Sequence, residues 1–213
     1  MNEQSNFWKG NFGNQYTERN AVDLDNLYEK NFGLTRTALN NDMLTDVNTN
    51  ASILEAGCNR GLQLELLRRQ GFTKLWGIDI NAKALEHARK EKQNNIVEGS
   101  ILDIPFKDNY FDLVFTSGVL IHIHPSNIKQ ALSELYRTTK KYIWCFEYFA
   151  DTYTEISYRK NTNKMWKADF LSIFMEFYPD LAIIKQKKLQ YIDEPDKEDM
   201  MFLLKKTEQK HNN

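Results

Sequence analysis

The sequence predicts an α/β protein with a mostly parallel sheet, and three observations support that prediction. Short apolar runs alternate with segments of helical spacing between residues 52 and 148. The first run ends in a glycine-containing loop that opens directly into a helical pattern. Two further runs, 181–189 and 200–205, close the chain and are joined by a turn around Pro195. Such alternation gives parallel strands with right-handed crossovers, and the closing pair adds an antiparallel hairpin.

The opening stretch is unusually aromatic. Phe7, Trp8, Phe12 and Tyr16 fall within ten positions, whereas disordered segments lack large apolar groups. We therefore expect an irregular lid that folds over a ligand. A poorly ordered leader is the simpler alternative.

Helices and strands are expected in a regular order after this lid. Apolar spacing predicts a short helix around 21–28 and a second over 34–47, with Thr35 as its N-cap. Later helices are expected at 82–92, 127–140 and 167–177. After the first strand, the others are expected at 74–80, 96–99, 111–117, 142–148, 181–189 and 200–205.

The loop after the first strand contains Glu55, Gly57, Asn59 and Gly61. Glycine lacks a Cβ and adopts positive φ, so the backbone can approach a ligand while the next helix presents free N–H groups. Asparagine tolerates positive φ nearly as well. Glycine turns of this kind also occur without ligands, but Asp79 ends the next strand about 20 residues on, where a sugar-binding acid belongs.

Four ordered motifs between residues 52 and 148 resemble those of class I S-adenosylmethionine-dependent methyltransferases. They are the glycine loop, Asp79, the segment 99–106, and the strand 111–114 with its following loop. Within that superfamily, Asn59 and the stretches 7–20 and 120–125 are similar to the pseudaminic acid biosynthesis-associated methyltransferases. The resemblance implies a Rossmann-like class I methyltransferase fold with a seven-stranded sheet, and S-adenosyl-L-methionine as the cofactor.

The resemblance also implies a cofactor site. Asp79 would accept the ribose hydroxyls, although it could merely cap the next helix. Ser100 and Ile101 would flank adenine, and because serine replaces the usual acid, the adenine amino group would contact Asp103 or the backbone. The expected cofactor-binding residues are Tyr16, Arg19, Glu55, Gly57, Asn59, Gly61, Asp79, Ile80, Ser100, Ile101, Ser117 and Gly118.

Arg19 is the expected partner of the methionine carboxylate, because arginine binds carboxylates in a bidentate manner. Pairing with a nearby surface acid such as Glu18 or Asp23 is the alternative. The expected organisation is a lid with helices over 1–50, a cofactor-binding core over 51–206 and a frayed tail over 207–213, all in one domain.

His122 is the expected catalytic residue, since it follows the fourth strand and imidazole titrates near neutral pH. Holding the loop through hydrogen bonds is an equal alternative. His122 and His124 alternate with isoleucine, so a strand would place both on one face; no third ligand is positioned for a metal. The expected substrate-binding residues, whose aromatic and charged groups suit a polar, sugar-like acceptor, are Trp8, His124, Glu147, Tyr148, Tyr158, Arg159 and Trp166.

The composition bounds the function. The 213 residues carry a net charge of −1, which gives no electrostatic reason to bind nucleic acid. No apolar run reaches the ~20 residues needed to span a membrane, and the amino terminus does not resemble a signal peptide, so a cytoplasmic location is expected. Cys58 and Cys145 are expected to be reduced thiols. No feature specifies an oligomeric state.

We therefore expect a methyltransferase that moves the methyl group of S-adenosyl-L-methionine to nitrogen or oxygen of a small polar acceptor. If the finer resemblance holds, that acceptor is an amino-sugar or nonulosonic (pseudaminic-type) acid intermediate. Two alternatives stay open: a protein or RNA methyltransferase, which an open basic groove would favour, and a catalytically silent cofactor-binding domain.

Overall fold

The computed structural model describes residues 3–90 and 95–207. Its helices are α1 (Glu3–Lys9), α2 (Asn11–Arg19), α3 (Leu24–Phe32), α4 (Arg36–Met43), α5 (Leu62–Arg69), α6 (Ala82–Lys90), the 3₁₀ turn η1 (Leu120–His122), α7 (Pro125–Thr138) and α8 (Phe170–Phe177). Its strands are β1 (Ser52–Ala56), β2 (Lys74–Asp79), β3 (Ile96–Glu98), β4 (Phe111–Ser117), β5 (Thr139–Tyr148), β6 (Thr154–Glu155), β7 (Trp166–Lys167), β8 (Leu181–Gln190) and β9 (Glu198–Lys206).

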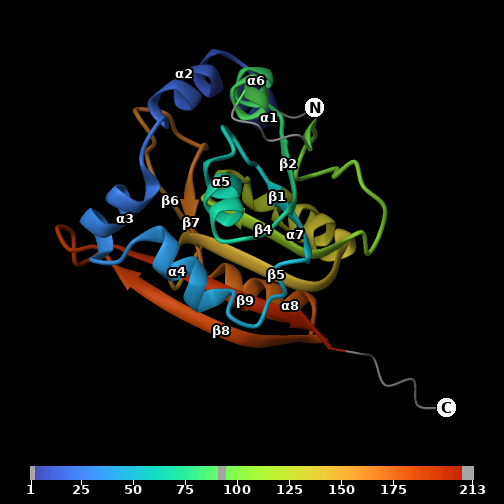
Figure 1. The fold of residues 1–213 in the computed structure, drawn as a ribbon. Coiled ribbons are helices and arrows are strands. Elements are labelled where there is room, and N and C mark those ends of the chain that lie inside the picture. The colour runs from blue at the N-terminus through green and yellow to red at the C-terminus, as the bar shows by residue number, and fades with distance from the viewer. Residues whose placement is uncertain (1–2, 91–94, 208–213) are drawn as a thin grey trace.

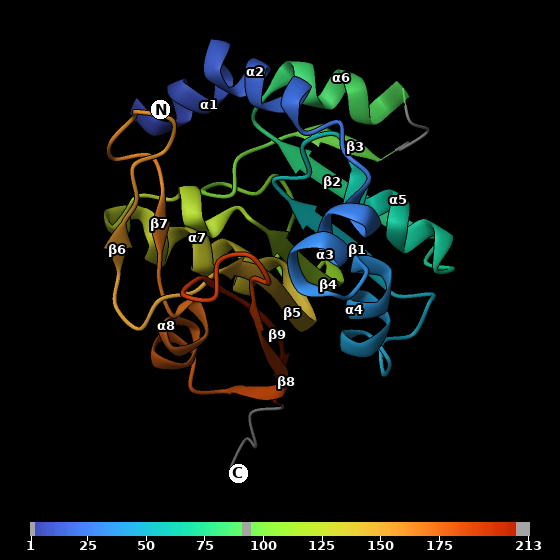
Figure 2. The ribbon, with the colours of Figure 1, turned by 90° about the vertical axis from the view of Figure 1, so that its left-hand side faces the viewer.

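Seven strands form the central sheet in the order β3-β2-β1-β4-β5-β9-β8 (Figures 1 and 2). The first five are parallel, while β9 runs antiparallel to both β5 and β8. The predicted mostly parallel sheet with a carboxy-terminal antiparallel hairpin is therefore confirmed. The strand order changes direction between β1 and β4, and sheets of this kind bind ligands at the carboxyl ends of the strands beside such a point.

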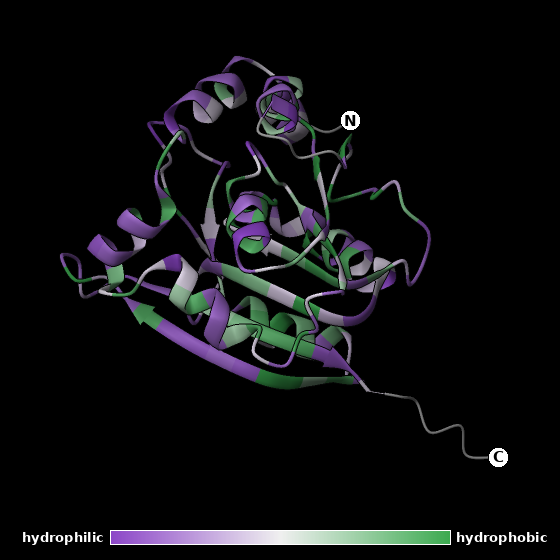
Figure 3. Ribbon diagram, viewed as in Figure 1, coloured by the Kyte–Doolittle hydropathy of each residue, from purple (hydrophilic) through white to green (hydrophobic). Residues whose placement is uncertain are grey.

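Helices cover both faces of the sheet. Ile53 and Leu54 are neighbours in β1, both have 0% exposed surface, and each packs into a different apolar cluster. One cluster joins the sheet to α7 and α8, and the other joins it to α3, α4, α5 and α6. Strands buried on both faces are nearly continuous in apolar residues, and the inner strands are accordingly mostly hydrophobic in Figure 3.

The edge strand β8 is different. Its middle, residues 185–188, reads Lys-Gln-Lys-Lys and is the hydrophilic stretch of that strand in Figure 3. Lysines on an edge strand discourage pairing with other chains. Within the described residues, no helix is both long enough and apolar enough to cross a membrane.

The amino-terminal segment differs from its prediction, because it forms the two short helices α1 and α2 and not an irregular lid. The helix predicted at 34–47 begins as expected, since the Thr35 side chain accepts the N–H of Ala38 at 3.1 Å. It ends earlier, at Met43, where the Thr45 hydroxyl donates to the Asn41 carbonyl at 2.8 Å and occupies a free acceptor of the last turn.

Two predicted segments, the helix at 82–92 and the tail at 207–213, extend into residues that the structure does not describe. The helix predicted at 82–92 is α6, and residues 91–92 lie outside the described part of the chain. Of the predicted frayed tail, 208–213 also lie outside it. Thr207 is held, because its N–H and its hydroxyl both donate to the Asp180 carbonyl, at 2.9 and 2.7 Å.

Candidate active site

A cavity of about 350 Å³ lies where β1, β2, β3 and β4 end, and residues of α1 and α2 also line it. Figure 2 shows α1 and α2 above these strands. This volume falls in the range of small-molecule sites. The predicted site residues that line it are Trp8, Tyr16, Glu55, Gly57, Asn59, Asp79, Ile80, Ser100, Ile101, Ser117, Gly118, His122, Tyr148 and Tyr158. Those that lie outside its lining are Arg19, Gly61, His124, Glu147, Arg159 and Trp166.

The glycine loop adopts the backbone that its sequence predicts. Gly57, Asn59 and Gly61 have φ values of 82°, 45° and 75°. A Cβ on Gly57 would also lie 2.7 Å from Cγ2 of Val119, in the loop after β4. Asparagine thus occupies the left-handed region in place of a third glycine, and Gly57 allows two ligand-facing loops to touch.

Asp79 joins this loop to the next helix. Its Oδ2 accepts the N–H of Asn59 and its Oδ1 accepts the N–H of Asn81, both at 2.8 Å. The cap of α6 is Asn81, whose side chain accepts the N–H of Ala84 at 2.9 Å. Burial raises the pKa of Asp79. The carboxylate is half-buried at the cavity wall, so each oxygen keeps capacity to accept a ligand hydroxyl.

The helices α1 and α2 are fastened to the carboxyl ends of the strands. The Gln4 amide donates to the His122 carbonyl and accepts the His124 N–H at 2.9 Å. Across the same face, Asn81 Nδ2 donates to the Trp8 carbonyl at 2.9 Å. Glu3 pairs with Lys164 of the segment after β5 at 2.9 Å. The two helices therefore close over the cavity as a roof.

His122 sits among aromatic rings at the cavity wall. Its centroid lies 4.3 Å from that of Trp8, 5.5 Å from that of Tyr158 and 6.3 Å from that of Tyr16. Burial lowers the pKa of His122 to about 4, so the imidazole is neutral near neutral pH. Nδ1 lies 3.1 Å from the Lys164 carbonyl, which can only accept, so Nδ1 carries the proton and Nε2 is the acceptor.

His122 and His124 do not lie on a strand, so they do not share one face of it. His122 ends the 3₁₀ turn η1, and His124 is the N-cap of α7, where its Nδ1 accepts the N–H of Ser126 at 3.2 Å. Pro125 begins α7 and favours this helical start over an extended segment. Among the described residues, no group of three or more His, Cys, Asp or Glu side chains could hold a metal ion.

Comparisons with known proteins show what this part of the chain is similar to. Residues 54–145 match the family model described as a methyltransferase domain. A 2-phytyl-1,4-naphtoquinone methyltransferase of Nostoc sp. is 38% identical over 96 residues, which cover 41% of each chain. Residues 54–145 therefore resemble a methyltransferase domain, and this likeness supports S-adenosyl-L-methionine as the cofactor.

Solved structures agree on the fold. A protein of Pyrococcus horikoshii matches with a TM-score of 0.67 and 17% identity, covering 91% of this chain and 95% of the other. The 1,6-didemethyltoxoflavin-N1-methyltransferase of Burkholderia thailandensis, crystallised with 1,6-didemethyltoxoflavin and S-adenosylhomocysteine, matches with a TM-score of 0.69 and 12% identity, covering 96% and 87%.

The residues of this site fit S-adenosyl-L-methionine, because buried polar atoms beside the cavity lack protein partners. Among the described residues, Glu55 Oε2, Asn59 Oδ1 and Arg36 Nη2 are buried without a hydrogen bond. Such groups normally find partners. An amino acid moiety offers an ammonium for Glu55 and a carboxylate for Arg36.

Arg36 is a site residue that the sequence did not reveal. It is 0% exposed and donates to the Tyr28 hydroxyl at 2.6 Å, to Asn40 Oδ1 at 2.8 Å and to Ser117 Oγ at 3.2 Å. Tyr28 and Ser117 line the cavity. In the sequence, Arg36 reads as a polar position at the start of a surface helix, so no local signal marks it.

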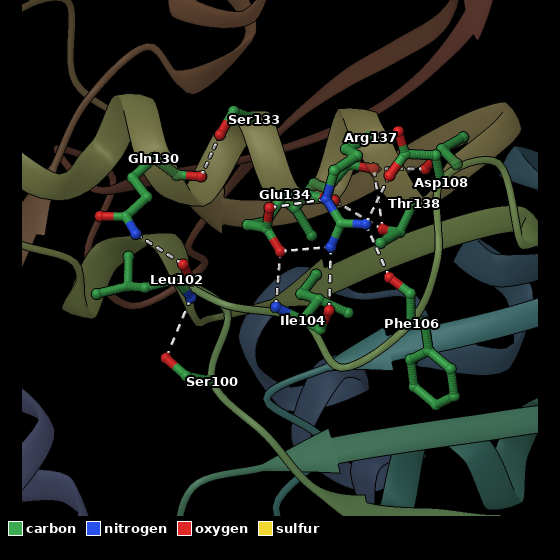
Figure 4. Close-up of polar contacts among 12 residues, drawn as sticks. Ser100, Leu102, Ile104, Phe106, Asp108, Gln130, Ser133, Glu134, Arg137 and Thr138 are labelled. Carbon is green, nitrogen blue, oxygen red and sulfur yellow. Dashed lines mark hydrogen bonds and ion pairs between the residues drawn. The ribbon is translucent and has the colours of Figure 1, made fainter. Parts of the chain in front are cut away.

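The segment after β3 is held by α7 (Figure 4). Arg137 donates to the carbonyls of Ile104 at 3.0 Å and Phe106 at 2.7 Å, while Glu134 accepts the Ile104 N–H at 2.7 Å. One turn earlier, Gln130 donates to the Leu102 carbonyl at 2.8 Å. The loop that follows Ser100 and Ile101 is therefore anchored to α7 by hydrogen bonds, although it forms no helix itself.

Two predicted site residues engage other partners. Arg19 is exposed, and its guanidinium lies 5.6 Å from the centroid of the Phe12 ring. Glu147 is 1% exposed, and its carboxylate accepts the N–H groups of Val119 at 3.2 Å and Ile121 at 3.4 Å. Burial raises the pKa of Glu147 to about 7. Glu147 thus shapes the loop that carries His122.

Proposed function

We propose that this protein transfers the methyl group of S-adenosyl-L-methionine to nitrogen or oxygen of a small polar acceptor, an amino-sugar or nonulosonic (pseudaminic-type) acid intermediate. The observation that carries the proposal is the roofed cavity of about 350 Å³, which joins the glycine loop to an aromatic wall. An open basic groove, as a protein or RNA acceptor would need, is the contrasting arrangement.

The chain spans only 41% of the length of the Nostoc relative, so the activity of the whole protein belongs to this proposal. The names of that relative and of the Burkholderia enzyme both specify small molecules, which supports a small acceptor. Their acceptors differ, so they do not select one for this chain. The resemblance of Asn59 and the stretches 7–20 and 120–125 to the pseudaminic acid-associated family supports the sugar acid class.

In this proposal, the cofactor supplies an activated methyl group on a sulfonium leaving group when it is bound. Asp79 accepts the ribose hydroxyls, and Ser100 with Ile101 borders the adenine. Glu55 and Arg36 hold the amino acid end through opposite charges. Ser117 and Gly118 lie between these groups at the end of β4 and border the acceptor side.

The roof and His122 then position the acceptor. The roof formed by α1 and α2 excludes water and fixes the donor and acceptor in line, which is the main task of the protein in such a transfer. A neutral His122 with a free Nε2 accepts a hydrogen bond from the acceptor. Because burial lowers its pKa to about 4, His122 orients the acceptor more than it removes a proton.

The test has two stages. Mass spectrometry of the purified protein, and calorimetry with S-adenosylhomocysteine, should show that the cavity binds the cofactor. Release of S-adenosylhomocysteine is then measured against amino sugars, nonulosonic acids and their nucleotide-activated forms. Turnover with one of these classes supports the proposal. Absence of cofactor binding would refute the site, and binding without turnover of any acceptor would favour a silent domain.

A further inference from the structure

One end of the cavity lies beyond the strands assigned to the cofactor. The residues assigned to adenine, ribose and the amino acid end lie at the ends of β3, β2, β1 and β4, except Arg36, which lies on α4 with its guanidinium 4.8 Å from the centroid of the Phe146 ring. The cavity continues past β5 to β9, where Tyr148 and Asp199 line it. Strands lie about 4.8 Å apart, so this end is at least two strand spacings beyond β4.

Asp199 is the polar group at this end. It is 2% exposed and pairs in register with Tyr148 on β5. Its Oδ2 accepts the hydroxyl of Tyr191 at 3.1 Å. No lysine or arginine within residues 3–90 and 95–207 forms an ion pair with it, although Arg36 and Lys167 attract it from a longer distance. Asp199 is therefore a buried carboxylate with no direct counter-ion.

Tyr191, which donates to this carboxylate, belongs to a group of aromatic rings. Phe32 of α3 lies 4.6 Å from Tyr191 and 6.2 Å from Phe146, measured between ring centroids. All three line the cavity together with Tyr148. Aromatic faces attract cations, and a carboxylate among them adds a charged hydrogen-bond acceptor. The combination suits a nitrogen that carries a positive charge.

The charge of the lining supports the same choice. Among the described residues, the charged side chains that line the cavity are Glu55, Asp79, Asp199 and Arg60. Glu55 and Asp79 face the cofactor in the proposed arrangement, which leaves Asp199 for the acceptor. Burial raises the pKa of Asp199 to about 7, and a bound cation would favour its ionised form. An anionic group placed directly beside the Asp199 carboxylate would meet repulsion from it.

We infer that Asp199 and Tyr191, with the rings of Phe32 and Tyr148, form an acceptor subsite that binds a protonated amino group. The inference rests on the proposed small-molecule methyltransferase activity and narrows its acceptor to molecules that carry a free amine. Asp199 is a positioning residue in this subsite. Within the proposed acceptor classes, an amino sugar with an unacylated nitrogen fits, and a carboxylate group does not belong at this end.

The test uses matched probes on the full chain saturated with S-adenosylhomocysteine. D-Glucosamine is compared with D-glucose, and benzylamine with benzyl alcohol and benzoate, by calorimetry near neutral pH. Each amine should bind about 10-fold or more tightly than its neutral partner, since one charge-assisted pair separates them. Asp199→Asn should abolish this preference while S-adenosylhomocysteine affinity is retained, and Tyr191→Phe should reduce it.

Three results would overturn the subsite. They are equal affinity of the wild-type protein for amine and alcohol, no measurable amine binding, or an amine preference that survives in Asp199→Asn. The wild-type comparison alone decides the matter if Asp199→Asn fails to fold. Loss of S-adenosylhomocysteine binding by the wild-type protein would instead refute the proposed function, so the two failures are distinguishable.

Discussion

The carboxylate of Asp79 accepts the backbone N–H of Asn59 at 2.8 Å. This bond joins the end of β2 to the glycine loop after β1, so an acid that lines the cavity also holds the loop beside it. Asn59 stays at a φ of 45°, and its own side-chain oxygen remains buried without a partner in the described chain. The loop and the acid therefore form one unit.

Gly57→Ala should destabilise the loop. An alanine would keep an unfavourable φ of 82°, and its Cβ would lie 2.7 Å from Val119 Cγ2. We expect a loss of about 1–3 kcal/mol in the free energy of unfolding and weaker S-adenosylhomocysteine binding. Gly71→Ala is the matched control, because its φ is 94° but its Cβ would meet only Thr49 Cγ2 at 3.9 Å. Chemical denaturation and calorimetry measure both variants. Equal cofactor affinity in the two would argue against the contact between the loops.

Arg36→Lys should weaken S-adenosylhomocysteine binding by about 10-fold to 100-fold, because lysine keeps the charge but loses the fork that binds a carboxylate. Binding of 5′-methylthioadenosine, which lacks the amino acid end, should change little. Arg19→Ala should leave both affinities unchanged, since Arg19 is exposed, whereas Arg36 is buried and bonds to Tyr28 and Ser117 of the cavity lining. A loss confined to Arg19→Ala would restore Arg19 as the carboxylate partner.

His122 should make stability depend on pH. Its pKa is about 4 in the folded protein and 6.5 in the unfolded chain, so the unfolded chain binds more protons between these values. Stability should therefore fall as the pH drops below 6.5, by on the order of 3 kcal/mol when pH 4 is reached. His122→Asn lacks this contribution. As the pH falls below 6.5, the free energy of unfolding should therefore decrease less in the variant than in the wild type. Parallel pH profiles from urea denaturation would contradict the buried neutral imidazole.

Gln4→Ala should loosen the roof, because it removes the amide that bonds to His122 and His124 backbone groups. Hydrogen exchange of residues 3–20 should become faster in the variant, and S-adenosylhomocysteine should slow it less than in the wild type. Peptides from α8, which packs under the sheet, serve as the internal reference. Unchanged exchange in residues 3–20 would show that the roof does not depend on this contact.

The strands were predictable because burial on both faces leaves a direct mark on the sequence. The range predicted for β4 matches the structure, and β5 begins three residues earlier than predicted, at Thr139, in place of the end of a helix. Asp79 and the glycine loop were also predictable, since their spacing along the chain reflects one β-loop-α unit. Such signals are local, and the sequence retains them.

The rest depends on contacts between distant segments. Arg36 is buried because Tyr28, Trp144 and Phe146 surround its guanidinium. These three residues belong to α3 and β5, so the sequence around Arg36 does not show the contact. Asp199 enters the cavity because β9 pairs with β5 in one particular register. The α1–α2 roof was predicted as irregular because its asparagines and glycines weaken any helical pattern.

The binding of S-adenosylhomocysteine to wild type, Asp79→Ala and Asp151→Ala tests the central claim most directly, measured by calorimetry on each folded protein. Asp79→Ala removes charge-assisted hydrogen bonds worth about 1.5–3 kcal/mol each and frees the N–H of Asn59. Its affinity should therefore fall by at least about 10-fold. Asp151 is exposed and outside the cavity lining, so Asp151→Ala should bind like the wild type. Wild-type affinity in a folded Asp79→Ala protein would contradict the assignment of this cavity to S-adenosyl-L-methionine.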